Sequence, residues 1–166
     1  MTDASIAELQ QRIQRLEDES AIQRLIMSYG PAADAAMADF AGELWSDDGL
    51  YDWDASGEPH VGTAGVEAML RTDAHLGLVE AGVAHFAGPL LMELDGDAAT
   101  AINYSIIMRR EEKRFYVWRV SAVRWDLARA SDSWRVQRRT NRLLDSSGAG
   151  SELFGADAAR EMGFAD

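Results

Sequence analysis

The sequence has 166 residues, a length typical of one domain, and its 16 basic against 28 acidic residues give a formal net charge of −12. This charge argues against sequence-independent binding to nucleic acid or to anionic membranes, which need a basic surface, and no apolar run approaches the roughly 20 residues of a membrane span. Cysteine is absent, which excludes thiol catalysis, disulfides and thiolate zinc sites, and suits the reducing cytoplasm where we expect the protein to act.

Apolar residues at the start of the chain recur at helical spacing. The first of them are Ile6, Leu9, Ile13 and Leu16, and the stripe resumes over residues 22–29. This pattern predicts a long amphipathic helix, of which residues 1–16 form an extension that packs either on the protein's own sheet or on another subunit. Pro31 follows Gly30 and predicts the end of the helix or a kink, because proline cannot donate a backbone hydrogen bond.

The next segment predicts short helices around a short strand. An alanine-rich stretch over residues 32–38 favours resumed helix, and Asp39 is expected to cap a short helix through Trp45. Alternation of period two then predicts a strand over residues 50–53. Thr63 is expected to cap a further helix that ends near residues 75–77.

Residues 83–144 predict an antiparallel sheet. Strands are expected at 83–86, 90–94, 99–109, 115–127 and 134–144, with short turns that make the last three a meander. Helices first and long strands last favour an α+β fold, in which N-terminal helices cover a strongly curved sheet and form a cone-shaped barrel with an apolar interior. Residues 1–145 are expected to form this single domain. Residues 146–166 are a Gly/Ala/Ser-rich tail with a short helix around 156–162, which either orders against a neighbouring subunit or stays mobile.

Histidine is the first candidate for acid–base chemistry, because its ordinary pKa lies nearest neutrality. The sequence has three histidines. His60 adjoins a turn and His75 ends a helix, so both are expected on the surface. His85 lies between Ala84 and Phe86 in an apolar strand, where it is either a satisfied core residue or a catalytic base.

Three further residues are candidates beside His85. Asp34 is a carboxylate in an alanine-rich helix, and its alternative interpretation is an exposed acid. Tyr29 lies about 140° round the helix from Asp34, so both can border one cavity, although Tyr29 is equally readable as core. Arg142 belongs to a basic cluster of the last strand and could hold a carboxylate or enolate oxygen, unless it forms a surface ion pair. No histidine pair has metal-ligand spacing, and nucleotide-binding glycine motifs are absent, so no metal or cofactor is expected.

Several short motifs, in their order, resemble the SnoaL-like branch of the nuclear transport factor 2-like superfamily. Ile22-Gln23-Arg24-Leu25 leads to Tyr29 and Asp34, residues 39–49 read DFAGELWSDDG, and Trp134-Arg135-Val136 precedes Arg142. The resemblance covers roughly residues 13–145 and implies the cone-shaped α+β fold. It also implies a homo-oligomer, dimer or trimer.

Within that superfamily the sequence is similar to scytalone dehydratase, bile-acid 7α-dehydratase and hexachlorocyclohexane dehydrochlorinase. These lyases use an Asp–His dyad without metal or organic cofactor, and the resemblance assigns the dyad to Asp34 and His85. It matches Tyr29 to a tyrosine that precedes the aspartate, and Arg142 to an auxiliary arginine. Pro31 departs from the pattern and would break the match if it moved Asp34 away from the pocket. No histidine clearly matches the second histidine of scytalone dehydratase.

The resulting hypothesis is a cofactor-independent lyase or isomerase acting on a small apolar carbonyl or polycyclic substrate. His85 would be the base and Asp34 its partner, with Tyr29 and Arg142 as donors to the developing oxyanion. Expected apolar wall residues are Trp53, Leu70, Phe86, Tyr104 and Trp118. One alternative is a non-catalytic ligand-binding or structural subunit, similar to the β subunit of ring-hydroxylating dioxygenases. Another is a ketosteroid-isomerase-like enzyme in which a carboxylate is the base.

Overall fold

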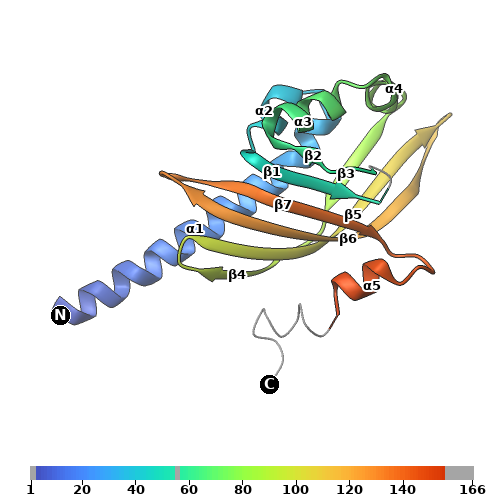
Figure 1. The fold of residues 1–166 in the computed structure, drawn as a ribbon. Helices are drawn as coiled ribbons and strands as arrows, with labels where there is room; N and C mark the ends of the chain where they lie inside the picture. Colours follow the sequence, from blue (N-terminus) through green and yellow to red (C-terminus); the bar gives the residue numbers. More distant parts are fainter. Residues whose placement is uncertain (1–2, 55–56, 156–166) are drawn as a thin grey trace.

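One long helix and one curled sheet make up most of the fold (Figure 1). The computed structural model describes residues 3–54 and 57–155. Its helices are α1 (Asp3–Asp34), α2 (Ala38–Gly42), α3 (Gly62–Leu70), α4 (Asp73–Ala81) and α5 (Ala149–Leu153). Its strands are β1 (Trp45–Trp53), β2 (His60–Val61), β3 (Val83–Ala87), β4 (Leu91–Asp95), β5 (Ala98–Glu111), β6 (Arg114–Ala130) and β7 (Ser133–Leu143). The α+β class is therefore confirmed.

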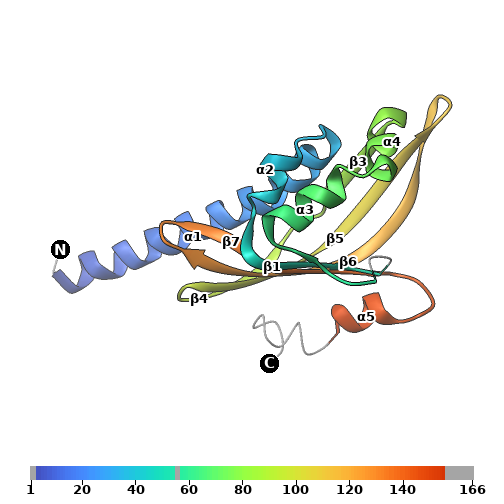
Figure 2. The same ribbon diagram turned by 45° about the horizontal axis from the view of Figure 1, so that its top comes forward.

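The sheet has the strand order β2-β1-β7-β6-β5-β3, and β4 pairs with β5 beside β3. The strands β5 to β7 are joined by tight turns, as the predicted meander of three strands requires. A hairpin turn also joins β4 to β5, and Gly96 supplies its positive φ of 58°. The pairing is antiparallel except between β1 and β7, which run parallel. These two strands are far apart in the sequence, so no hairpin forces them to run antiparallel. The sheet curls strongly and stays open (Figures 1 and 2).

Helix α1 continues through Pro31 to Asp34, so the helix does not end at Pro31, which was one of the two expected outcomes. Pro31 lies in the last turn of α1 and is exposed. Proline has no N–H to donate to the carbonyl of Met27, one turn earlier. Met27 is also exposed, so water can bind this carbonyl instead. The helix closes normally after it, since the Ala35 N–H donates to the Pro31 carbonyl at 3.0 Å. Pro31 therefore leaves Asp34 on the same helix as Tyr29.

Two expected helix boundaries differ from the structure. Helix α2 begins at Ala38 with Met37 as its N-cap, and it ends at Gly42 rather than Trp45. Trp45 instead begins β1 and pairs with Val136 of β7. Residues 62–81 form two helices rather than one, because the helical conformation is interrupted at residues 71–72. Thr72 caps the second one by accepting the His75 N–H at 3.3 Å, whereas Thr63 makes no cap.

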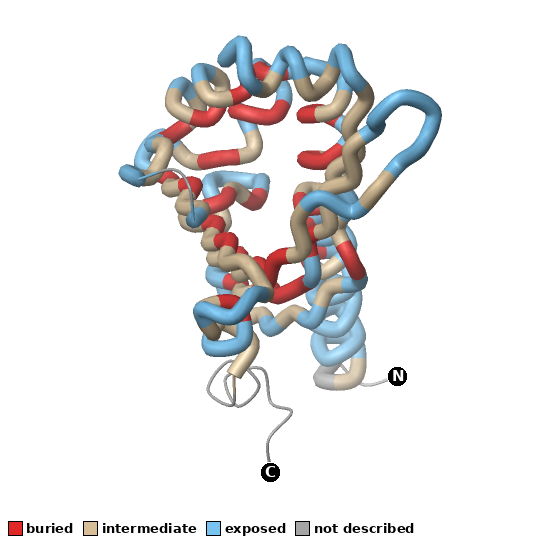
Figure 3. The backbone as a smooth tube through the Cα atoms, turned by 90° about the vertical axis from the view of Figure 1, so that its right-hand side faces the viewer, coloured by how far each residue is buried: buried red, intermediate tan, exposed pale blue. Residues whose placement is uncertain are grey.

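The core lies inside the curl of the sheet, under the second half of α1. Buried segments gather on this inner side in Figure 3, whereas the first half of α1 is exposed and projects beyond the sheet. The core is rich in aromatic rings, with Trp45 and Trp125 almost fully buried. Asp18 joins α1 to the sheet, since its Oδ1 accepts the Trp134 indole N–H at 3.1 Å and its Oδ2 pairs with Arg129 at 2.7 Å.

Helix α5 belongs to the segment expected as a tail, and it contacts β6 and β7. The helix expected around residues 156–162 lies outside the described residues. Within residues 3–54 and 57–155, no helix has both the length and the apolarity to cross a membrane.

Candidate functional site

A cavity of about 220 Å³ lies between the inner face of the sheet and the helices α3 and α4. Its wall takes residues from α1, α3, α4, β1, β3, β5, β6 and β7. Most of the surface of this wall is apolar, although eight of its fifteen residues are polar, namely Tyr29, Tyr51, Thr72, His75, His85, Arg119, Ser121 and Asn141. We call this space the central cavity. Its position inside an α+β cone agrees with the expected small-molecule site.

Asp34 and His85 meet at the wall of the central cavity. Asp34 Oδ1 lies 2.5 Å from His85 Nδ1, and Asp34 Oδ2 accepts the backbone N–H of His85 at 2.8 Å. A carboxylate only accepts hydrogen bonds, so His85 Nδ1 carries the proton, and Nε2 is the nitrogen with a free lone pair. Both side chains are largely shielded from solvent, at 14 % exposure for His85 and 23 % for Asp34. The structure thus brings together the two residues that the sequence singles out as a dyad.

Gly30 makes this meeting possible. A Cβ atom at Gly30 would lie 2.2 Å from the carbonyl oxygen of His85, far inside van der Waals contact. The missing side chain lets α1 approach the backbone of β3 at this point. Asp34 follows one helical turn later and therefore reaches β3 with its short side chain.

His75 also lines the central cavity, contrary to the expected surface position. Its Nε2 lies 3.0 Å from the carbonyl oxygen of Ala33, to which it donates, and its ring centre lies 6.0 Å from that of His85. The break between α3 and α4 turns His75 toward α1. Thr72, three residues before His75, is the sequence signal for a helix start that could have revealed this position.

Tyr29 is 4 % exposed and lines the same cavity. Burial, and next the neighbouring Tyr51, raise the pKa of Tyr29 well above 10, while Arg139 acts in the opposite direction. Tyr29 is therefore a neutral phenol that can donate a hydrogen bond throughout the neutral range. Its ring packs edge-on against Trp45 and Tyr51.

Arg139 is the buried arginine of the last strand, β7. It is 4 % exposed, and its guanidinium lies 4.2 Å from the ring centre of Tyr29, 4.6 Å from that of Tyr51 and 4.4 Å from that of Trp125. Arg139 Nε and Nη1 are buried without a hydrogen-bond partner among the described residues. Three aromatic faces therefore surround this cation.

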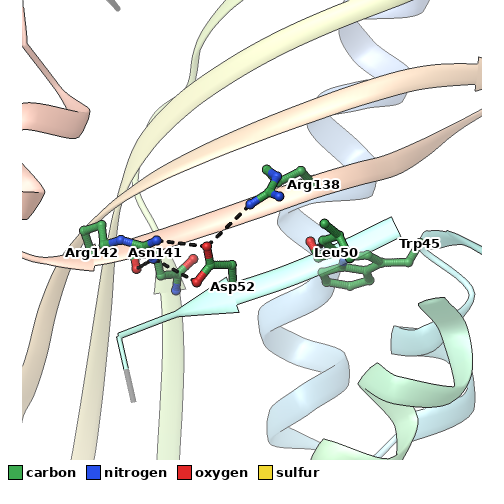
Figure 4. Close-up of polar contacts among 6 residues, drawn as sticks. All are labelled: Trp45, Leu50, Asp52, Arg138, Asn141 and Arg142. Atoms are coloured by element: carbon green, nitrogen blue, oxygen red, sulfur yellow. Dashed lines mark hydrogen bonds and ion pairs between the residues drawn. The ribbon is translucent and has the colours of Figure 1, made fainter. Parts of the chain in front are cut away.

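Arg142 does not line the central cavity, so the geometry gives no support to its expected role as an oxyanion donor. Its two terminal nitrogens donate to Asp52 at 3.1 and 2.9 Å, and Arg138 approaches the same carboxylate at 3.5 Å (Figure 4). These bonds to Asp52 raise the pKa of Arg142. Arg142 thus forms the ion pair that was the alternative interpretation of its sequence position.

A β-bulge explains why Arg139 faces inward and Arg142 outward. Asp126 of β6 pairs with Arg138, but the next residue, Leu127, pairs with Val136, which leaves Gln137 as an extra residue in β7. Such an insertion reverses which side chains face each side of the sheet. The buried positions accordingly change from Trp134 and Val136 before the bulge to Arg139 and Asn141 after it.

Three of the five expected wall residues line the cavity, namely Trp53, Leu70 and Trp118. Phe86 and Tyr104 do not line it, and they are 49 % and 53 % exposed. Phe86 follows His85 on β3 and so faces the opposite side of the sheet. Tyr104 packs edge-on against Phe154, just after α5, with ring centres 4.9 Å apart.

The cavity wall also contains polar residues that the sequence did not single out. Asn141 and Ser121 are buried, at 6 % and 4 % exposure. Arg119 pairs with Asp54 at 3.5 Å and lies over the Trp53 ring at 5.2 Å. Among the described residues, no three histidine, aspartate or glutamate side chains are grouped closely enough to hold a metal ion.

Comparison with known proteins places this geometry in a family. Residues 14–140 match the model of the SnoaL-like domain. An NTF2-like protein with a cystatin-like fold from Novosphingobium aromaticivorans is 38% identical over 90% of this chain and 96% of that chain, with a TM-score of 0.86. No curated protein matches the chain.

More distant structures share the fold. A protein of unknown function from Mycobacterium tuberculosis is 21% identical, with 91% of this chain and 88% of that chain covered and a TM-score of 0.72. A candidate scytalone dehydratase from N. aromaticivorans is 14% identical, with 79% and 87% covered and a TM-score of 0.65. At these identities the likeness concerns the fold alone. From the family match and the structure that is 38% identical, we conclude that the chain belongs to the SnoaL-like family of the nuclear transport factor 2-like superfamily.

Proposed function

We propose that this protein is a cofactor-independent enzyme that removes a proton from a carbon atom next to a carbonyl group. It would act as a lyase of the dehydratase or dehydrohalogenase type, or as an isomerase. The observation that carries the proposal is the Asp34–His85 pair, with Nδ1 and Oδ1 2.5 Å apart, at the wall of a largely apolar cavity. A histidine oriented by a largely shielded carboxylate is the arrangement of a general base.

In the proposed reaction, the free Nε2 of His85 takes the proton, and the C–H electron pair moves into the substrate to form an enolate. Asp34 keeps the imidazole in the required tautomer and stabilises the imidazolium ion that forms. General base catalysis of this kind contributes typically about 10²- to 10⁴-fold to the rate. The remainder must come from orientation and from donors to the enolate oxygen.

Tyr29 is the donor that we assign to that oxygen or to the departing group. Its buried phenol is neutral and lines the same cavity as His85. In a lyase, the enolate electrons form a C=C bond as the group on the next carbon leaves with its bonding pair. If that group is hydroxide, a donated proton releases it as water. In an isomerase, the imidazolium returns the proton to a different carbon.

The size of the cavity limits the substrate. A cavity of about 150 Å³ is enough to bind benzene, so about 220 Å³ suits a body of one or two fused rings. Trp53 and Trp118 contribute large aromatic side chains to the wall around such a ring. We therefore favour a small cyclic carbonyl compound over a four-ring substrate.

A test that needs no knowledge of the natural substrate uses β-tetralone in deuterium oxide. Proton abstraction next to its carbonyl group exchanges hydrogen for deuterium, which NMR follows directly. We expect exchange above the buffer rate with the wild-type protein and the buffer rate with His85→Gln. A parallel assay follows the dehydration of β-hydroxycyclohexanone to cyclohexenone by its ultraviolet absorbance. Binding of both probes without either reaction would contradict the enzymatic proposal and support a ligand-binding protein instead.

A further inference from the structure

The central cavity contains an unpaired polar group that the proposed chemistry does not use. Asn141 is 6 % exposed and lines the cavity, and its Oδ1 is buried without a hydrogen-bond partner among the described residues. A buried amide oxygen is normally paired, because leaving it unpaired forfeits its interaction with water. A ligand that donates a hydrogen bond to this oxygen would restore the missing interaction.

Ser121 adds a second polar group beside Asn141. In the pairing of β6 with β7, Ser121 stands opposite Leu143 and Asn141 stands opposite Val123, which makes Ser121 and Asn141 diagonal neighbours on one face. Both line the central cavity, and the Ser121 hydroxyl can donate one hydrogen bond and accept others. A hydroxyl group of a ligand can donate to one of these oxygens and accept from the other side chain.

These two residues lie on other strands than the dyad, Ser121 on β6 and Asn141 on β7. His85 is on β3, and β5 and β6 separate β3 from β7 in the curled sheet. Three strand spacings from His85 to Asn141 measure roughly 14 Å along the sheet, and in a curled sheet the direct path across the inner side is shorter. A ring system that reaches His85 with one edge can therefore present its far edge to Asn141.

The charge at this end favours a neutral ligand group. The only lysine or arginine among the lining residues, Arg119, already faces the carboxylate of Asp54 at 3.5 Å. Asn141 and Ser121 are themselves uncharged. A hydroxyl group fits these partners, whereas a carboxylate or phosphate would find no unpaired cation among the residues that line the cavity.

We propose that Asn141 and Ser121 bind a hydroxyl group of the substrate, remote from the carbon that loses its proton. The substrate class is then a cyclic carbonyl compound of one or two fused rings that carries a second oxygen at its far edge. The assignment of the reacting end rests on the proposed function, whereas the hydroxyl subsite can be tested by binding alone.

The test compares two probes by isothermal titration calorimetry, namely β-tetralone and its analogue hydroxylated on the far ring. We expect the hydroxyl group to lower Kd about 5- to 10-fold in the wild-type protein, the gain of one well-made hydrogen bond. Asn141→Leu keeps a similar side-chain shape without the acceptor and should bring the ratio of the two Kd values close to one. Ser121→Ala should reduce the ratio in part.

Thr140→Val is the matched control, because Thr140 precedes Asn141 on β7 and faces the other side of the sheet. It should leave the ratio unchanged. Should Asn141→Leu fail to fold, as judged by circular dichroism, Asn141→Ala, which also lacks the acceptor, replaces it. An equal Kd for both probes in the wild type, or an undiminished preference in folded Asn141 and Ser121 variants, would overturn the subsite.

His85→Gln separates this proposal from the proposed function. It should abolish deuterium exchange of β-tetralone and keep the Kd ratio of the wild type. If the wild type itself shows the ratio without any exchange, the hydroxyl subsite stands and the catalytic proposal fails.

Discussion

Gly30 and His85 lie in such close contact that a methyl group on Gly30 would be 2.2 Å from the His85 carbonyl oxygen. This contact is one helical turn from Asp34, whose carboxylate holds the backbone and the ring of the same histidine. The dyad is therefore positioned by the packing of α1 on β3 rather than by the two side chains alone. An aspartate on a helix and a histidine on an edge strand meet only if these backbones touch.

Gly30→Ala should move α1 away from β3 and loosen the dyad. We expect a loss of about 1–3 kcal/mol in the free energy of unfolding, as for other overpacked sites, together with a broadened or shifted NMR signal of the His85 Nδ1 proton. Gly77→Ala is the control, because a Cβ atom there meets nothing within 4 Å. In the middle of α4 it should stabilise slightly, by about 0.5–1 kcal/mol. A Gly30→Ala protein with unchanged stability and signal would refute this role.

Asp34→Asn and His85→Gln should each lower the rate of β-tetralone exchange by at least about a hundredfold. Asparagine still accepts the His85 backbone N–H but offers its own amide hydrogens to Nδ1, which favours the wrong tautomer. The controls are Asp132→Asn, an exposed acid in the turn between β6 and β7, and His60→Gln, a histidine outside the cavity lining. If the wild-type protein catalyses exchange and both dyad variants exchange at the same rate, the catalytic base is another residue.

Tyr29→Phe should change the alkaline stability of the protein. Burial raises the pKa of Tyr29 above its ordinary value of 10.0, whereas the same tyrosine ionises near 10 in the unfolded chain. Its contribution to stability is therefore fully present below pH 10 and lost as the pH rises above 10 through the raised pKa. Urea unfolding at about pH 8 and about pH 11 should show a steeper loss in the wild type than in Tyr29→Phe. Equal losses would mean that Tyr29 ionises normally in the folded protein.

Local patterns in the sequence were sufficient to predict the strands β3 to β7 and their turns, but not the first half of β1. Alternating residues and Gly96 predict the meander from β4 to β7, and the order of elements predicts the α+β class. Asp34 and His85 could be paired only through the family resemblance, because no local pattern relates a helix residue to a strand residue 51 positions later. Their pairing depends on tertiary packing at Gly30.

Residues that depend on register could not be assigned in the same way. The bulge at Gln137 exchanges the faces of β7, so Arg139 rather than Arg142 points inward. No feature of the arginine-rich segment marks where the extra residue lies. His75 was misplaced for a similar reason, because one expected helix is in fact two and the second has its own direction.

Asp18→Asn should weaken the connection between α1 and the sheet. Burial alone would raise the pKa of Asp18, but hydrogen bonds from Arg129, Trp134 and Gln14 outweigh it and lower the pKa below 3.8. The carboxylate therefore contributes stability above that pH, and the contribution is lost as the pH falls through the lowered pKa. We expect the variant to lose about 1–3 kcal/mol at neutral pH and to show a flatter acid dependence in urea unfolding. Asp132→Asn is the control, and identical acid profiles for the wild type and Asp18→Asn would contradict the assignment.

The projecting half of α1 supplies the last prediction, which concerns association. Its apolar stripe is exposed, with Ile6 at 40%, Leu9 at 44%, Ile13 at 55% and Leu16 at 64%, on a segment that extends clear of the sheet in two views (Figures 1 and 2). An isolated helix of this length is marginal in water, and spacings of three and four residues suit a seam between helices. We propose that a second copy covers the stripe.

The double variant Leu9→Glu, Leu16→Glu places two like charges in the proposed seam. Light scattering coupled to size-exclusion chromatography should report two or three copies for the wild type and one copy for this variant. The double variant Gln10→Glu, Gln11→Glu adds the same charge beside the stripe and should keep the wild-type mass. Because the stripe lies far along α1 from the dyad, deuterium exchange of β-tetralone should persist in the monomer. A wild type that is already monomeric, or a Leu9/Leu16 variant of unchanged mass, would show that the stripe does not join copies of this chain.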